Sequence, residues 1–75
     1  MNAEQYRAAA IDLVIRLTGM TREEAEEIID PESAAAWWED WNTGHNRCIV
    51  ASYVAAALLD HGYVSDGTYY GSDTP

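Results

Sequence analysis

The sequence predicts an all-α fold, a small bundle of four helices around a central C-terminal helix. Residues 48–59 contain no charged side chain although the chain is otherwise acidic, and a helix that is apolar all round needs neighbours on every side. Three shorter segments before it have apolar residues at helical spacing, and two of these segments begin with a capping-box sequence. These segments are therefore predicted to surround the last helix.

The first helix is expected over residues 3–18. Asn2 and Gln5 have the spacing of a capping box, and Gly19 suits the left-handed residue that ends a helix. One face carries apolar residues at spacings of four, three and four, namely Tyr6, Ala10, Leu13 and Leu17. Ile11 and Ile15 form a second apolar stripe almost opposite this face. We expect a second copy of the chain, a partner helix or the C-terminal tail to cover it.

The second helix is short and is expected over residues 22–29. Thr21 and Glu24 have capping-box spacing, and Met20 stands where a hydrophobic staple would reach Ala25. Pro31 ends this helix, because a proline pushes the residue before it out of the helical region. A helix of about eight residues is marginal alone, so its apolar side chains must dock on the rest of the chain.

The third helix is expected over residues 31–42, with Asp30 as its cap and Pro31 at its first position. Its three tryptophans fall within about a 100° arc and can face one side. Trp41 lies at the middle of the arc and Trp38 at its edge, so Trp41 is predicted to be the more deeply buried and the more important for stability.

The last helix is expected over residues 45–61, with Asn42 or Thr43 as its cap and Gly62 after its end. Ala55 is expected to lie close against a neighbouring helix. The tail that follows has two short β-prone arms about Asp66-Gly67, which form a hairpin only if they pack on the helices. Residues 71–75 are expected to fray. The sequence has no repeat or linker and predicts a single domain, 1–75.

Composition restricts the partner. The 75 residues include thirteen acids, four arginines and no lysine, for a net charge of −9. Nucleic acid and anionic membranes both need cationic contacts, so neither is expected to bind directly, and a basic protein surface is favoured. The apolar run is shorter than the roughly 18 to 20 residues of a membrane span. With one cysteine and no secretory signal at its start, the chain is expected in the cytoplasm.

Two histidines and the cysteine are the residues to consider for catalysis or metal binding. His45 and Cys48 are one turn apart and could offer an imidazole and a thiolate to one metal, or act as base and nucleophile. A structural zinc site needs four ligands, and no Cys-x-x-Cys is present. Cys48 is therefore interpreted as a small buried hydrophobe, and His61 as a favourable side chain at the negative end of its helix. The sequence predicts neither an enzyme nor a cofactor or metal site.

The acidic residues are concentrated in one segment. Eight of the thirteen lie between Glu23 and Asp40, with no positive charge in that window. They form either a simple solvated surface or rows of carboxylates that imitate a phosphate strand and attract a groove lined with Lys and Arg. The residues predicted to bind such a partner are Glu23, Glu26, Glu27, Asp30, Glu32, Glu39 and Asp40.

In size, charge and lack of lysine, with EEAEEIIDPE running into AAAWWEDW, the chain resembles the small phage-encoded inhibitors of bacterial defence, among them anti-CRISPR proteins and DNA mimics. That class has no shared motif. The resemblance implies only that the chain acts in the host cytoplasm, binds an effector such as a CRISPR effector subunit, and blocks nucleic acid entry or a conformational step.

Three functional hypotheses follow, and the third, an enzyme or metal protein, ranks far behind the other two. In the first, the chain is an acidic inhibitor that occupies a basic, nucleic-acid-binding groove. In the second, it is a small helical interaction or dimerisation domain that uses Ile11 and Ile15, and the acids only keep it soluble. Added salt should distinguish the first two, because it weakens an electrostatic complex and not an apolar one.

Overall fold

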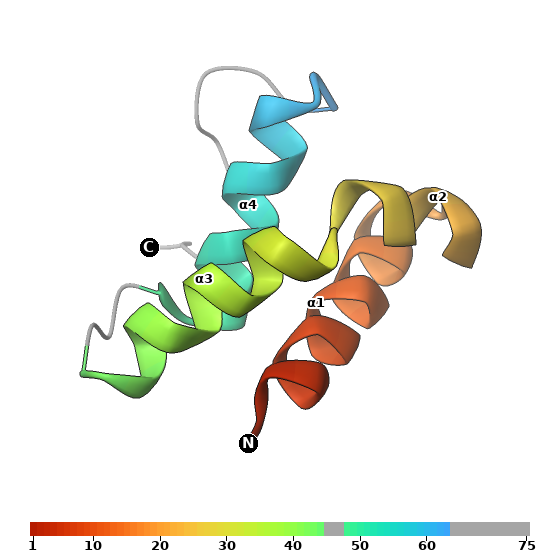
Figure 1. The fold of residues 1–75 in the computed structure, drawn as a ribbon. Coiled ribbons are helices and arrows are strands. Elements are labelled where there is room, and N and C mark those ends of the chain that lie inside the picture. Colours follow the sequence, from red (N-terminus) through yellow and green to blue (C-terminus); the bar gives the residue numbers. More distant parts are fainter. Residues whose placement is uncertain (45–47, 64–75) are drawn as a thin grey trace.

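The computed structural model describes residues 1–44 and 48–63, and these residues form four α-helices and no strand (Figure 1). The helices are α1 (Ala3–Thr18), α2 (Arg22–Ile28), α3 (Pro31–Asn42) and α4 (Val50–Asp60). The all-α prediction is confirmed, and the first three helices match their predicted bounds to within one residue. The predicted hairpin lies outside the described residues except for its first position, and the predicted frayed end lies wholly outside them.

Local capping explains why the first two helices begin where the sequence predicts. The Asn2 side chain accepts a hydrogen bond from the Gln5 N–H at 2.8 Å, and the Gln5 side chain accepts one from the Asn2 N–H at 2.9 Å. Thr21 and Glu24 repeat this reciprocal arrangement at the start of α2. Gly19 ends α1 with φ 75°, a left-handed conformation that glycine adopts without steric cost.

The helix at the centre of the fold is α1, not the C-terminal helix. It packs against each of the other three, and Figure 1 shows α2 folded back at its C-terminal end. The prediction of a central α4 is wrong in this respect. The uncharged run is rich in alanine and gives a thin helix that leaves Leu59 exposed, whereas α1 carries larger apolar side chains on two sides. Ala55 is buried but is not part of the core cluster, so its expected close contact with a neighbouring helix stays a prediction.

The second apolar stripe of α1 is used inside the fold. Ile11 is 3 % exposed and belongs to the core, and Ile15 is half-buried against it. The expectation that Ile11 needs a second chain or the tail to cover it is therefore wrong. An apolar stripe does have to be covered, and here the other helices of the same chain cover it because α1 is central.

Tyrosines, rather than tryptophans, contribute the largest buried rings. Tyr6 and Tyr53 are buried, whereas the three tryptophans are only half-buried and pack against the rim of the core. The Trp41 ring lies 6.2 Å from that of Tyr6. Trp41 and Trp38 are both half-buried, so the predicted greater importance of Trp41 stays a prediction; the residue of α3 that enters the core is a small one, Ala34 at 1 % exposure.

The start of α4 differs from the prediction. Ile49 occupies the capping position without a side-chain hydrogen bond, and Thr43 instead ends α3, its hydroxyl donating to the Glu39 carbonyl at 3.0 Å. Just before α4, the Cys48 carbonyl accepts a hydrogen bond from the Tyr6 hydroxyl at 2.6 Å. A contact between residues 42 positions apart leaves no signal in the local sequence. The predicted start at residue 45 is therefore earlier than the observed start of α4 at Val50. His45 lies outside the described residues.

The end of α4 follows the prediction. Gly62 has φ 82°, and the Tyr63 N–H donates to the Leu58 carbonyl at 2.8 Å while the Gly62 N–H donates to the Leu59 carbonyl. These two bonds are those of a Schellman motif, which satisfies carbonyls that the helix leaves unpaired.

Candidate functional site

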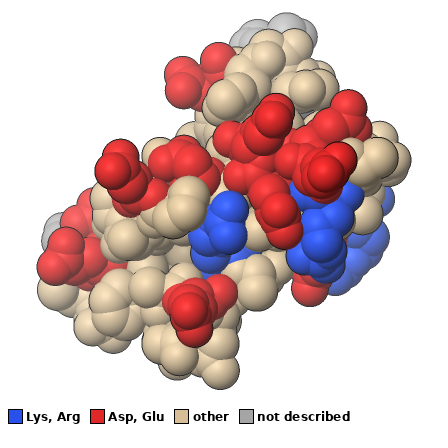
Figure 2. Space-filling model, turned by 45° about the vertical axis from the view of Figure 1, so that its right-hand side comes forward, with Lys and Arg blue, Asp and Glu red and all other residues tan. Residues whose placement is uncertain are grey.

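Six of the seven predicted partner-binding residues are exposed on α2 and α3. We call them the acidic surface: Glu23, Glu26, Glu27, Glu32, Glu39 and Asp40. Figure 2 shows acidic side chains spread across one face of the molecule, with arginine side chains among them. The surface therefore presents carboxylates to solvent over two successive helices.

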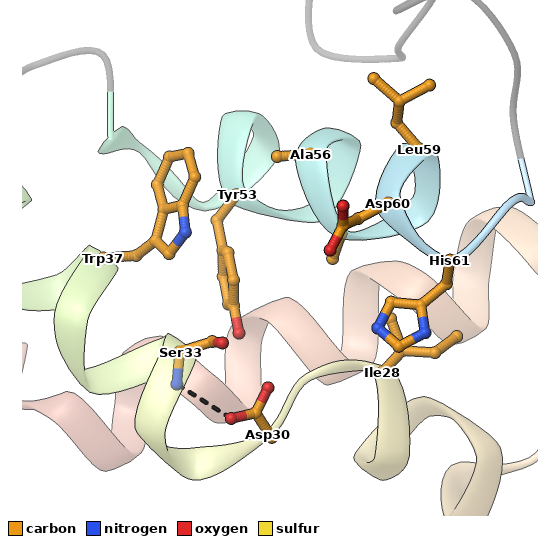
Figure 3. Close-up of a pocket in the computed structure, with 10 residues that line it drawn as sticks. Ile28, Asp30, Ser33, Trp37, Tyr53, Ala56, Leu59, Asp60 and His61 are labelled. Carbon is orange, nitrogen blue, oxygen red and sulfur yellow. Dashed lines mark hydrogen bonds between the residues drawn. The ribbon is translucent and has the colours of Figure 1, made fainter.

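Asp30, the seventh predicted residue, has a different position. It is half-buried at the junction of α2 and α3, and its Oδ2 accepts a hydrogen bond from the Ser33 N–H at 3.0 Å (Figure 3). This backbone bond, followed by the bond to the Ser33 side chain, lowers the pKa of the Asp30 carboxyl group. Asp30 is thus the cap of α3, and its negative charge stabilises the N-terminal end of that helix.

Two arginines reach this part of the fold from outside the acidic segment. Arg7 of α1 donates from Nε to the Ile29 carbonyl at 2.7 Å and from Nη2 to the Glu26 carbonyl at 3.3 Å. Arg22 forms a 2.9 Å ion pair with Asp12, and both side chains are more than half exposed. Arg22 immediately precedes the sequence window between Glu23 and Asp40, whereas Arg7 reaches it only because α1 packs against α2.

A pocket of about 450 Å³, partly open to solvent, lies beside the acidic surface and was not predicted. Its chemically distinctive lining residues are Asp30, Ser33, Trp37, Tyr53, Asp60 and His61. Figure 3 shows the Tyr53 phenol pointing from α4 toward Asp30 and Ser33, with Trp37 beside it. The pocket therefore joins the start of α3 to the C-terminal end of α4.

Tyr53 is the most unusual residue of this pocket. Its side chain is 2 % exposed, yet its hydroxyl has no hydrogen-bond partner among the described residues. Burial, followed by the nearby charge of Asp30, raises the pKa of Tyr53 to about 12, so the hydroxyl is neutral at physiological pH. The only sequence signal for this residue is a phenol within an uncharged run, and the sequence does not show which side chains lie around it.

Within the described residues, no three of His, Cys, Asp and Glu come together as a metal would require, and no helix is long and apolar enough to cross a membrane. Cys48 is half-buried. The hypothesis of a His45–Cys48 pair stays untested, because His45 lies outside the described residues.

Comparison with known proteins gives no family for this chain. No family model, curated protein or solved structure matches it. Its function is therefore argued from the acidic surface and the neighbouring pocket.

Proposed function

We propose that the chain is an acidic protein inhibitor that binds the basic, nucleic-acid-binding surface of an effector protein, such as a CRISPR effector subunit, and blocks access of nucleic acid. The observation that carries this proposal is the acidic surface, six exposed carboxylates on two successive helices. With them the chain has a net charge of −9, which is larger in magnitude than the solubility of a small domain requires.

The mechanism is competitive occlusion. Residues one turn apart on a helix, such as Glu23 and Glu27, have Cβ atoms about 5–6 Å from each other, so their carboxylates can reach neighbouring side chains that otherwise hold phosphates. Each carboxylate would pair with an Arg or Lys of the groove, and a bidentate arginine pair is among the stronger hydrogen-bonded contacts. An occupied groove cannot hold its nucleic acid at the same time.

The alternative, an apolar interface made by α1, has less support. Ile11 is buried within the chain and Ile15 is half-buried on the core, so the stripe offers little surface to a partner. None of the large apolar side chains that are exposed in the described part of the chain comes from α1: Met1 precedes that helix, and Ile49, Leu59 and Tyr63 lie on α4 or at its ends.

Charge reversal on α2 tests the proposal. Fluorescence anisotropy would follow the release of labelled DNA or RNA from purified nucleic-acid-binding effectors of the bacterial host, CRISPR effector subunits among them. We expect the chain to release nucleic acid from one of them, and Glu23→Lys with Glu27→Lys to weaken this inhibition by at least about tenfold, as expected when two close charge pairs become repulsive. Inhibition should also fall steeply as salt is added.

The matched control reverses two exposed acids of α1, Glu4→Lys with Asp12→Lys, and gives the same net charge. Loss of the exposed Asp12–Arg22 pair should cost about 0–1 kcal/mol of unfolding free energy, so the control should fold and inhibit. Glu26 is left unchanged because Arg7 binds its carbonyl. The proposal fails if no effector releases its nucleic acid, if both double variants lose inhibition equally, or if salt has no effect.

A further inference from the structure

The hydroxyl of Tyr53 is a polar group that the described part of the fold leaves unsatisfied. A buried hydroxyl without a partner is unfavourable, and native proteins seldom retain one without a reason. The matching phenol of Tyr6 is also buried, but it donates to the Cys48 carbonyl. Tyr53 instead lines the pocket, where a bound group could supply the missing hydrogen bond.

The groups around this hydroxyl favour a cation. Asp30 and Asp60 place two carboxylates on the pocket, and the C-terminal end of α4 adds the negative end of a helix dipole. Trp37 also lines the pocket, with its indole ring packed against that of Tyr53 at 5.3 Å between ring centres, so the wall beside the hydroxyl is aromatic. Arg7 also acts electrostatically on Tyr53, but its guanidinium donates to carbonyls of the α2 end and does not line the pocket.

We propose that this pocket holds the guanidinium group of an arginine side chain on the partner's basic surface. The guanidinium pairs with Asp60, lies beside the Trp37 indole that lines the pocket, and donates one N–H to the Tyr53 hydroxyl oxygen. A flat group with several donors fits an aromatic wall and divided acceptors better than the compact ammonium of lysine does. The apolar side chains of Ile28 and Ala57, which also line the pocket, would contact the methylene stem.

This inference rests on the proposed function for its partner, whereas the pocket itself can be tested without one. The ligand for the test is N-acetyl-L-arginine methylamide, titrated into the ¹⁵N-labelled full chain, with the corresponding lysine compound as comparison. We expect saturable shifts of the Trp37 indole N–H and of the Asp60 and His61 amides. Binding of the arginine compound should be tighter than that of the lysine compound.

Two variants assign the contacts. Tyr53→Phe removes only the hydroxyl and should weaken binding by about tenfold, the worth of a hydrogen bond to a charged donor. Asp60→Asn should weaken it by about threefold, as expected of a largely exposed ion pair. Asp12→Asn changes the net charge by the same amount on α1, outside the pocket, and should leave binding unchanged. The amide spectrum of each variant shows whether it folds.

The inference is overturned if the arginine compound gives no saturable shift, if folded Tyr53→Phe binds it as tightly as the wild type, or if Asp12→Asn weakens binding as much as Asp60→Asn. Each of these results would leave the proposed function standing, because that depends on the α2 glutamates. Conversely, loss of the inhibitory activity would not change the titration. In a complex with the effector, Tyr53→Phe should weaken binding without changing its dependence on salt, since no charge is altered.

Discussion

Tyr6 and Tyr53 stack with their ring centres 5.8 Å apart, and their hydroxyls have opposite environments. That of Tyr6 donates to the Cys48 carbonyl, and burial raises its pKa. That of Tyr53 faces the pocket without a partner in the described residues. Replacing each tyrosine with phenylalanine removes only its hydroxyl oxygen, so the two variants compare a hydroxyl that stabilises the fold with one that does not.

We expect Tyr6→Phe to lower the free energy of unfolding by about 1–3 kcal/mol, because the Cys48 carbonyl loses its donor. Tyr53→Phe should leave the stability within about 0.5 kcal/mol of the wild type or raise it, because an unsatisfied hydroxyl is removed. Urea unfolding followed by circular dichroism measures both. A larger loss in Tyr53→Phe than in Tyr6→Phe would mean that the Tyr53 hydroxyl is satisfied in solution.

At the scale of the helix, the starts of α1, α2 and α3 were predictable and the start of α4 was not. The first three depend on side chains that bond backbone groups three residues away, as Asn2, Thr21 and Asp30 do, so the signal lies within the local sequence. The segment before α4 is held instead by Tyr6, which no local pattern reveals. The central role of α1 was hidden for a similar reason, since it depends on packing against all three other helices.

Asp30 gives the element-scale prediction. Asp30→Ala should cost about 1 kcal/mol at neutral pH, because the Ser33 N–H loses its acceptor, while Asp30→Asn keeps an acceptor and should cost less. Since folding lowers the pKa of this carboxyl, its contribution is complete above the unfolded value of about 3.9 and is lost as pH falls through the folded value.

Thermal unfolding between neutral pH and about pH 3 tests this expectation. The difference between wild type and Asp30→Ala should shrink on acidification. The control is Glu32→Gln, which removes an exposed charge in the same first turn without removing a cap; it should have the smaller effect. A pH-independent Asp30→Ala penalty would show that the carboxylate form is not what caps α3.

At the scale of the whole molecule, the exposure of the acidic surface followed from its sequence spacing, since charged positions opposite an apolar stripe face solvent. The pocket could not be predicted in this way. Trp37 and Tyr53 meet across two helices, and Asp30 joins them only because α2 and α3 turn at Pro31. A one-dimensional pattern assigns faces to single helices, whereas a pocket depends on how three of them converge.

The net charge itself predicts how salt acts on the free chain. Nine excess negative charges share a molecule with a radius of gyration of 11.5 Å, close to the Debye length of about 10 Å at 0.1 M salt. At lower ionic strength the carboxylates therefore repel across the whole domain, and such repulsion opposes compact folding. The ion pair between Asp12 and Arg22 is exposed, so screening it costs little.

We expect the melting temperature of the free chain to rise as NaCl increases from about 0.02 to about 0.5 M, with roughly 4–8 °C for each kcal/mol gained. Glu23→Lys with Glu27→Lys changes the net charge from −9 to −5, because each substitution adds two positive charges, and this variant should respond less. Salt would then act in opposite directions on the free chain and on its complex, stabilising the fold while weakening the contact with a basic partner. A melting temperature that falls with salt would instead mean that ion pairs, rather than repulsion between carboxylates, dominate the surface, and this would weaken the electrostatic argument on which the proposed function depends.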